Sequence, residues 1–246
     1  MPRFFLSGGS TVAGGTAFIA GEDAKHVKVL RLRIGDKLIL CDGKGLDYHC
    51  SVKNMAGESV ECEVFETVPC MAEPSVKVQI LVGLPKGDKA ETIIQKCVES
   101  GAEEILFFPS ERCVMKLKSG SEGKKLERWQ RIAEEAAKQS GRGIVPQVGL
   151  LGDLAEAFNR AKATDLPLFM YETGERETMR EAVNSVSDIR TAAIITGPEG
   201  GFEAYEAELA RVMGLHICSM GPRIFRCETA PVAALSALMY ATGNLD

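Results

Sequence analysis

The 246-residue sequence is poor in the residue patterns that build metal sites and disulfide frameworks. It has only three histidines, and its eight cysteines form no C-x-x-C pair. Structural zinc sites usually draw on two closely spaced pairs of ligands, whereas Cys41, His49 and Cys50 stand without a second cluster. We therefore expect free thiols, most of them buried, and no metal.

The sequence also lacks any apolar run approaching the roughly 20 residues that a membrane-spanning helix needs. The first residues, MPRFFLSGGSTVAGG, have no apolar region typical of a signal peptide. Hydrophobic residues make up 45% and charged residues 26% of the chain, an ordinary balance for a globular protein. These features predict a cytoplasmic protein with no membrane partner.

An overall excess of positive charge is missing as well, since the net charge is −5. The basic residues are nevertheless concentrated in two stretches. Residues 25–33, KHVKVLRLR, hold four Lys or Arg and no acid, and residues 112–142 hold nine Lys or Arg against four Glu. A basic face of this kind can bind a polyanion, although solvated surface helices would explain either stretch alone.

Two textures divide the chain. Up to about residue 70, short alternating segments separated by glycine turns predict a small antiparallel barrel or sandwich, and residues 71–75, MAEPS, have the composition of a linker. From Val76 onward, near-continuous apolar strands alternate with amphipathic helices, which predicts a parallel sheet covered on both faces. Ligands of such sheets bind beyond the carboxyl ends of the strands, so attention falls on the loops after Tyr171, Thr196 and Met220.

The loop after Thr196, in the stretch TGPEGGF (196–202), is neither a P-loop nor a G-x-G-x-x-G turn. Its glycines let backbone groups approach a ligand closely, but Glu199 would repel a pyrophosphate. The loop therefore suits a neutral or cationic ligand, such as an adenosine carrying a positive sulfonium. A plain glycine turn, with Glu199 or Glu203 near a helix N-terminus, remains the alternative.

The loop after Met220, GPRIFRCETAP (221–231), carries two arginines on either side of two apolar residues. Arg223 and Arg226 could bind a phosphate or a polarised carbonyl bidentately. They could instead pair with acids such as Glu228 and only fix the loop. Thr229 and Pro231 predict the start of a final helix.

Five stretches together resemble the RsmE family of 16S ribosomal RNA uridine-N3 methyltransferases, within the SPOUT superfamily. They occur in the family's order and span nearly the whole chain. The last two stretches are the most specific to the family. Met220 and Phe225 depart from the leucine that the family often has. The stretches are HVKVLRLRIGD (26–36), KAETIIQKCVESG (89–101), RWQRIAEEAAKQSGR (128–142), TGPEGGF (196–202) and MGPRIFRCETAP (220–231).

The resemblance implies a PUA-like RNA-binding β-barrel at residues 1–72 and an α/β SPOUT methyltransferase domain at residues 73–246, with a parallel sheet and a C-terminal trefoil knot. It also implies S-adenosyl-L-methionine as cofactor, a homodimer, and methylation of N3 of a specific uridine, the m3U1498 site, in 16S rRNA within the assembled 30S subunit. The alternatives are a related knotted methyltransferase acting on tRNA, a non-catalytic ribosome-assembly protein, and a nicotinamide-linked oxidoreductase. The chain lacks the glycine fingerprint after the first strand that the oxidoreductase would need.

The resemblance and the basic stretches supply three sets of candidate residues. Arg226 and Arg223 are expected to stabilise negative charge on the uracil, and Glu228 to accept the N3 proton. The cofactor set is Met170, Tyr171, Gly197, Glu199, Gly200, Gly201, Met220, Gly221, Ile224, Phe225, Arg226, Thr229 and Ala230. The RNA-binding set is Lys25, His26, Lys28, Arg31, Arg33, Lys86, Arg112, Lys116 and Arg142.

Overall fold

The computed structural model describes residues 1–6, 9–114 and 122–245. Within it the chain forms two compact units, one made of Met1–Glu73 with Ala137–Val145 and the other of Pro74–Ala136 with Pro146–Asp246. The first unit is therefore built from two separate parts of the sequence, a discontinuity that residue patterns did not predict.

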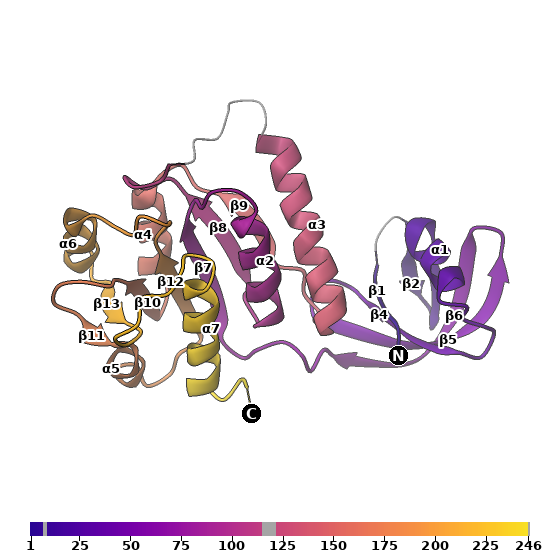
Figure 1. The fold of residues 1–246 in the computed structure, drawn as a ribbon. Coiled ribbons are helices and arrows are strands. Elements are labelled where there is room, and N and C mark those ends of the chain that lie inside the picture. The colour runs from indigo at the N-terminus through magenta and orange to yellow at the C-terminus, as the bar shows by residue number, and fades with distance from the viewer. Residues whose placement is uncertain (7–8, 115–121, 246) are drawn as a thin grey trace. The chain divides into compact units, whose positions relative to one another are not determined.

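The first unit holds a six-stranded sheet in the order β1-β4-β5-β6-β3-β2 (Figure 1). Its pairings are antiparallel except for β1 with β4, which run parallel. Apolar side chains of the sheet form a core that Ala24 and Val27 of α1 complete. The elements are β1 (Arg3–Phe5), β2 (Thr11–Ala13), β3 (Thr16–Ile19), α1 (Gly21–Val29), β4 (Lys37–Cys41), β5 (Leu46–Ala56) and β6 (Ser59–Pro69).

The cysteines of this unit have ordinary packing partners. The Cys41 thiol donates to the Gly143 carbonyl oxygen at 2.9 Å, and His49 pairs with Glu66 at 3.0 Å. All eight cysteines of the chain are free, and all except Cys113 are buried. Among the described residues, no three His, Cys, Asp or Glu side chains are placed to share a metal ion.

The second unit holds a seven-stranded sheet in the order β11-β13-β10-β12-β7-β8-β9, and every pairing in it is parallel, as predicted. Its strands are β7 (Lys77–Gly83), β8 (Glu104–Phe108), β9 (Gln147–Leu150), β10 (Leu166–Met170), β11 (Glu177–Thr178), β12 (Thr191–Thr196) and β13 (His216–Ser219). Its helices are α2 (Lys89–Glu99), α3 (Glu122–Ser140, which belongs to this unit up to Ala136), α4 (Leu154–Lys162), α5 (Met179–Asn184), α6 (Ala204–Val212) and α7 (Ala230–Ala241).

Helices cover both faces of this sheet (Figure 1). On one face, α4 and α6 bury Phe158 and Ala210 against Leu81, Phe169 and Ile195. The opposite face lies against α7, which packs on β7, β12 and α2, and against α5, which packs on β10 and β13. All five residues of β10 are buried, which is why this strand is apolar without alternation.

The topology of this sheet determines where the predicted loops lie. Because the sheet is parallel, the carboxyl ends of β10, β12 and β13 meet at one edge, and the three loops singled out in the sequence follow them. No helix within the described part of the chain has both the length and the apolar character needed to cross a membrane.

Candidate functional site

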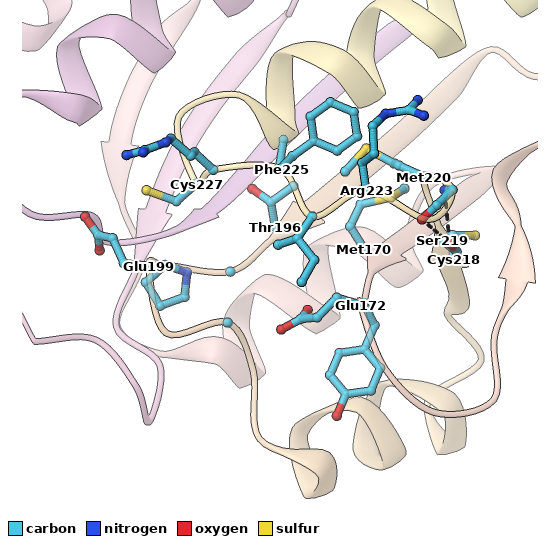
Figure 2. Close-up of a pocket in the computed structure, with 18 of the residues that line it drawn as sticks. Met170, Glu172, Thr196, Glu199, Cys218, Ser219, Met220, Arg223, Phe225 and Cys227 are labelled. Carbon is cyan, nitrogen blue, oxygen red and sulfur yellow. Dashed lines mark hydrogen bonds between the residues drawn. The ribbon is translucent and has the colours of Figure 1, made fainter.

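A cavity of about 380 Å³ lies at the carboxyl ends of β10, β12 and β13. Its size is within the roughly 300–1,000 Å³ of small-molecule pockets. Figure 2 shows side chains from the ends of all three strands gathered around it, among them Met170, Thr196 and Cys218. The three predicted loops therefore converge on one site.

Most residues of the predicted cofactor set line this cavity. Gly200 and Thr229 do not line it, and neither does Glu228 of the catalytic set, although its neighbour Cys227 does. The predicted residues at the cavity are Met170, Tyr171, Gly197, Glu199, Gly201, Met220, Gly221, Arg223, Ile224, Phe225, Arg226 and Ala230. The lining residues absent from the candidate sets are Lys89, Glu172, Arg176, Thr196, Pro198, Cys218, Ser219, Pro222 and Cys227.

The glycine loop after β12 is tightly folded. Gly201 has φ +68°, and its N–H donates to the Pro198 carbonyl oxygen at 3.0 Å. A Cβ on Gly83, at the end of β7, would lie 2.7 Å from the Pro198 nitrogen, so β7 also needs glycine where the loop passes. Phe202 then anchors the loop, with its ring centroid 4.4 Å from that of Phe169.

The Glu199 carboxylate is paired within the protein. It accepts from the Lys89 ammonium at 2.9 Å and from the Lys86 backbone N–H at 3.0 Å. Burial would raise the pKa of Glu199, but these hydrogen bonds lower it below its usual value. The charge in the middle of the glycine loop is thus matched by the start of α2, a pairing between residues far apart in the sequence.

Lys89 also connects the loop to the segment before α7. Its ammonium lies 3.6 Å from the Glu228 carboxylate and 3.7 Å from the Cys227 sulfur. The hydrogen bond with Glu199 raises the pKa of Lys89. A hydrogen bond from its own backbone N–H lowers the pKa of Glu228, helped by Cys227 and Lys89, while burial raises the pKa of Cys227 to about 12. At neutral pH the carboxylates are therefore charged and the Cys227 thiol is protonated.

Thr196 supplies an unmet polar group. Its side chain is fully buried, its residue lines the cavity, and its hydroxyl has no hydrogen-bond partner among the described residues. Buried polar atoms are nearly always paired, because an unpaired one costs free energy. A ligand with a donor or an acceptor in the cavity would remove that cost.

Arg223 and Arg226 remain available for binding. Both side chains are exposed at the cavity, and neither guanidinium makes a hydrogen bond or an ion pair with any described residue. The alternative in which they form an ion pair with Glu228 is not realised, since Glu228 pairs with Lys89, although the charge of Arg226 also helps to lower the pKa of Glu228. Two free guanidinium groups at a cavity rim can bind a phosphate or stabilise negative charge on a bound base.

The predicted RNA-binding residues divide into separate groups. Those from the first basic stretch are exposed on or just after α1, where Lys28 donates to the Gly57 carbonyl. Lys86 is exposed as well, and Lys116 lies outside the described residues. The exposed residues of the first stretch are Lys25, His26, Lys28, Arg31 and Arg33.

The prediction for Arg142 is wrong, and Arg112 has protein partners. The Arg142 side chain is 4% exposed and pairs with Glu73 at 2.7 Å, so it cannot reach an RNA phosphate. Arg112 pairs with Glu203 at 2.7 Å and donates to the Gly200 carbonyl oxygen at 2.9 Å. A count of basic residues does not distinguish these committed arginines from free ones.

Two family models match the chain. Residues 72–239 match an RNA methyltransferase domain, and residues 19–65 match an RNA methyltransferase PUA domain. Among curated relatives, the ribosomal RNA small subunit methyltransferase E of Bacillus subtilis is 39% identical over 92% of this chain and 91% of its own length. The protein of the same name from Synechocystis is 32% identical over 86% of this chain and 68% of its own length.

Solved structures agree in fold over almost the whole length. The ribosomal RNA small subunit methyltransferase E of Neisseria gonorrhoeae, bound to S-adenosyl methionine, superposes with a TM-score of 0.82, 29% identity and 98% of each chain covered. A putative methyltransferase of Legionella pneumophila, in complex with the same cofactor, superposes with a TM-score of 0.82 and 28% identity over 98% of this chain and 97% of its own.

Proposed function

The chain belongs to the ribosomal RNA small subunit methyltransferase E family, and from this premise we propose that it transfers a methyl group from S-adenosyl-L-methionine to N3 of one uridine of 16S rRNA in the assembled 30S subunit. The observation that carries the proposal is the cavity at the ends of β10, β12 and β13. It is formed by the same glycine and arginine loops that match the family.

The residues of the cavity fit this cofactor. An adenosine presents ring nitrogens and hydroxyls, which the backbone of a glycine loop and the unpaired Thr196 hydroxyl can bind. Met170 and Phe225 offer apolar contact to the purine and the methionine chain. The pairing of Glu199 with Lys89 leaves no uncompensated charge on the loop itself.

When bound, S-adenosyl-L-methionine supplies an activated methyl group and a neutral leaving group. The protein positions the uracil and stabilises the negative charge that the uracil acquires as the N3 proton leaves. Arg226 and Arg223 stabilise the negative charge that develops on the uracil oxygens, because both guanidinium groups are free at the cavity. Glu228 is our candidate for the proton acceptor: it does not line the cavity itself, but it follows Cys227, which does, and its carboxylate is charged at neutral pH.

The remaining parts of the proposal rest on family resemblance. They are the trefoil knot, the homodimer, a cytoplasmic location and recognition of RNA by the exposed basic residues of α1. The target base must be unpaired or flipped for N3 to be reached. Binding through phosphates should weaken as salt rises.

The decisive experiment measures transfer of labelled methyl to unmethylated 30S subunits, naked 16S RNA and tRNA in parallel. Reverse transcription then locates the product, because methylation at N3 blocks the pairing edge. A single stop in 16S RNA, strongest with 30S subunits, is expected. Label in tRNA alone would show that the substrate is tRNA and not 16S rRNA. Cofactor binding without any methyl transfer would favour a non-catalytic assembly protein.

A further inference from the structure

Every nitrogen of the Arg112 guanidinium is committed to a partner in the second unit. Nε and Nη2 donate to the two carboxylate oxygens of Glu203 at 2.7 and 2.9 Å, and Nη1 donates to the Gly200 carbonyl oxygen at 2.9 Å. A bidentate arginine–carboxylate pair has a fixed plane, so the third bond also has a defined direction. Arg112 therefore holds a main-chain group of the glycine loop in one orientation.

That main-chain group is restrained at both ends. The peptide between Gly200 and Gly201 gives its carbonyl to Arg112 and its N–H to the Pro198 carbonyl oxygen, at 3.0 Å. Rotation of this peptide would break both hydrogen bonds at once. Gly200 itself does not line the cavity, whereas the residues on either side, Glu199 and Gly201, do. The hydrogen bond to Arg112, on the side of the loop that faces away from the cavity, thus sets the direction of the backbone that lines the cavity.

The packing at this point leaves no room for adjustment. A Cβ on Gly200 would lie 2.9 Å from the Arg112 Cβ, so the two backbones approach more closely than other residues would allow. The neighbouring residue Glu111 also bonds to the segment that follows the glycine loop. Glu206 closes the capping box of α6 with Glu203, and its other carboxylate oxygen accepts the Glu111 N–H at 3.2 Å. Residues 111 and 112 together hold the segment from Gly200 to the first turn of α6.

We propose that Arg112 is a positioning residue for the methyl-donor pocket, which keeps the 197–201 loop in its binding conformation before the ligand arrives. Arg112 does not line the cavity, so it acts through Gly200 and Glu203. A loop that is already ordered loses less conformational entropy on binding. The identity of the ligand rests on the proposed function, but the ordering of the loop does not.

An RNA phosphate is the competing partner, because the Arg112 side chain is 42% exposed and lies in the second basic stretch. Arg128 provides a matched control. It belongs to the same stretch, is also exposed, and pairs at 2.8 Å with Glu91, which is not a residue of the glycine loop. Loss of either arginine removes one positive charge, but only Arg112 contacts the loop.

The test compares Arg112→Ala, Arg112→Lys, Glu203→Gln and Arg128→Ala with the unchanged chain. Amide hydrogen exchange of residues 197–203 is measured without ligand, donor affinity is measured by calorimetry with S-adenosyl-L-methionine, and RNA affinity by filter binding to 16S RNA at two salt concentrations. Arg112→Ala should speed exchange in the loop and weaken donor binding about tenfold, as expected for lost charge-assisted hydrogen bonds. Its RNA affinity should equal that of Arg128→Ala.

The conservative variants keep the test meaningful if Arg112→Ala folds poorly. Arg112→Lys keeps the charge but cannot serve three acceptors in one plane, so it should restore RNA affinity and not loop protection. Glu203→Gln should loosen the loop less than Arg112→Ala does. The combination of Arg112→Ala with Glu203→Gln should be no worse than Arg112→Ala alone.

The failures of the two proposals differ. Unchanged exchange and donor affinity in Arg112→Ala, with RNA affinity below that of Arg128→Ala, would overturn the positioning role and make Arg112 an RNA contact. If the unchanged chain binds no donor while Arg112→Ala still speeds exchange in the loop, the positioning role stands and the proposed methyl-donor function fails.

Discussion

The Arg142 Nη2 and the Glu73 Oε2 are 2.7 Å apart in an ion pair that is almost closed to solvent. The other oxygen of the same carboxylate accepts the N–H groups of Gly143 at 2.7 Å and Ile144 at 3.0 Å. One side chain from residue 73 thus holds three consecutive residues of a distant segment within the first unit.

Arg142→Ala should destabilise the protein by about 3 kcal/mol, because it leaves the Glu73 carboxylate buried without its cation. Urea denaturation measures the change, with Arg128→Ala as the exposed control, which should shift stability by less than about 0.5 kcal/mol. Equal stability of the two variants would show that the buried pair contributes no more than a surface pair.

Thr196→Val should leave stability unchanged or slightly raise it, since the buried hydroxyl has no partner in the protein. It should weaken binding of S-adenosyl-L-methionine about fivefold, the value of one neutral hydrogen bond. Calorimetry measures the affinity and thermal melting the stability. Thr196→Ser keeps the hydroxyl and should bind normally; if it binds as weakly as Thr196→Val, the hydroxyl is not a ligand contact.

Gly83→Ala should push the Pro198 turn outward, because the new Cβ would lie 2.7 Å from the Pro198 nitrogen. We expect a loss of about 2 kcal/mol in the free energy of unfolding, together with weaker donor binding. Gly123→Ala is the control, since nothing lies within 4 Å of a Cβ there. Placed in α3, it should be neutral or stabilising by up to about 1 kcal/mol.

The pairing of Lys89 with Glu199 predicts a pH dependence of stability. The folded pKa of Glu199 is below its ordinary value of 4.5, so its contribution is present above pH 4.5 and is lost as the pH falls through the folded pKa. The folded pKa of Lys89 is above 10.5, so its contribution is present below pH 10.5 and is lost at more alkaline pH. Both side chains are about one-third exposed, which limits the effect to about 1 kcal/mol.

Lys89→Met should therefore be less stable than the unchanged chain by about this 1 kcal/mol near pH 7, and the difference should shrink as the pH falls below 4.5 through the folded pKa of Glu199. Denaturant titrations at pH 7, 5, 4 and 3 measure it. A difference that stays constant down to pH 3 would mean that Lys89 stabilises by packing and not by charge.

The thiols should react unequally with a disulfide reagent at pH 8. Burial raises the pKa of Cys62, Cys218 and Cys227 to about 12, so these thiols stay protonated and shielded. Cys113 is the one cysteine that is not buried. A single fast thiol is expected, and Cys113→Ser should abolish it. Further fast thiols would indicate opening of buried segments.

The position of the site could be predicted from the sequence, because buried parallel strands ending in glycine and arginine loops have few places for a ligand. Lys89 and Thr196 could not be predicted in the same way. A threonine at a strand end and a lysine at a helix start carry no periodic signal. They matter because β12 lies between β10 and β7, which brings residue 89 beside residue 199.

The basic stretches show the limit of counting charges. The sequence pattern did not predict helix α1, which overlaps the first stretch. Only Asp23, Ala24 and Val27 of its nine residues are buried, too few to produce a clear apolar period. In the second stretch, Arg112 and Arg142 carry the same charge as their exposed neighbours. Their partners Glu203 and Glu73 lie far away in the sequence, and only the folded chain brings them together.

The division of the first unit between residues 1–73 and 137–145 has a consequence for biosynthesis. A chain that emerges from the ribosome at about 5–20 residues per second presents Glu73 several seconds before its partner segment has been made. During that interval the early sheet must persist with an unpaired carboxylate at its margin. A fragment that stopped at residue 73 would keep this defect permanently, so the first unit cannot be transferred to another protein as a simple N-terminal segment.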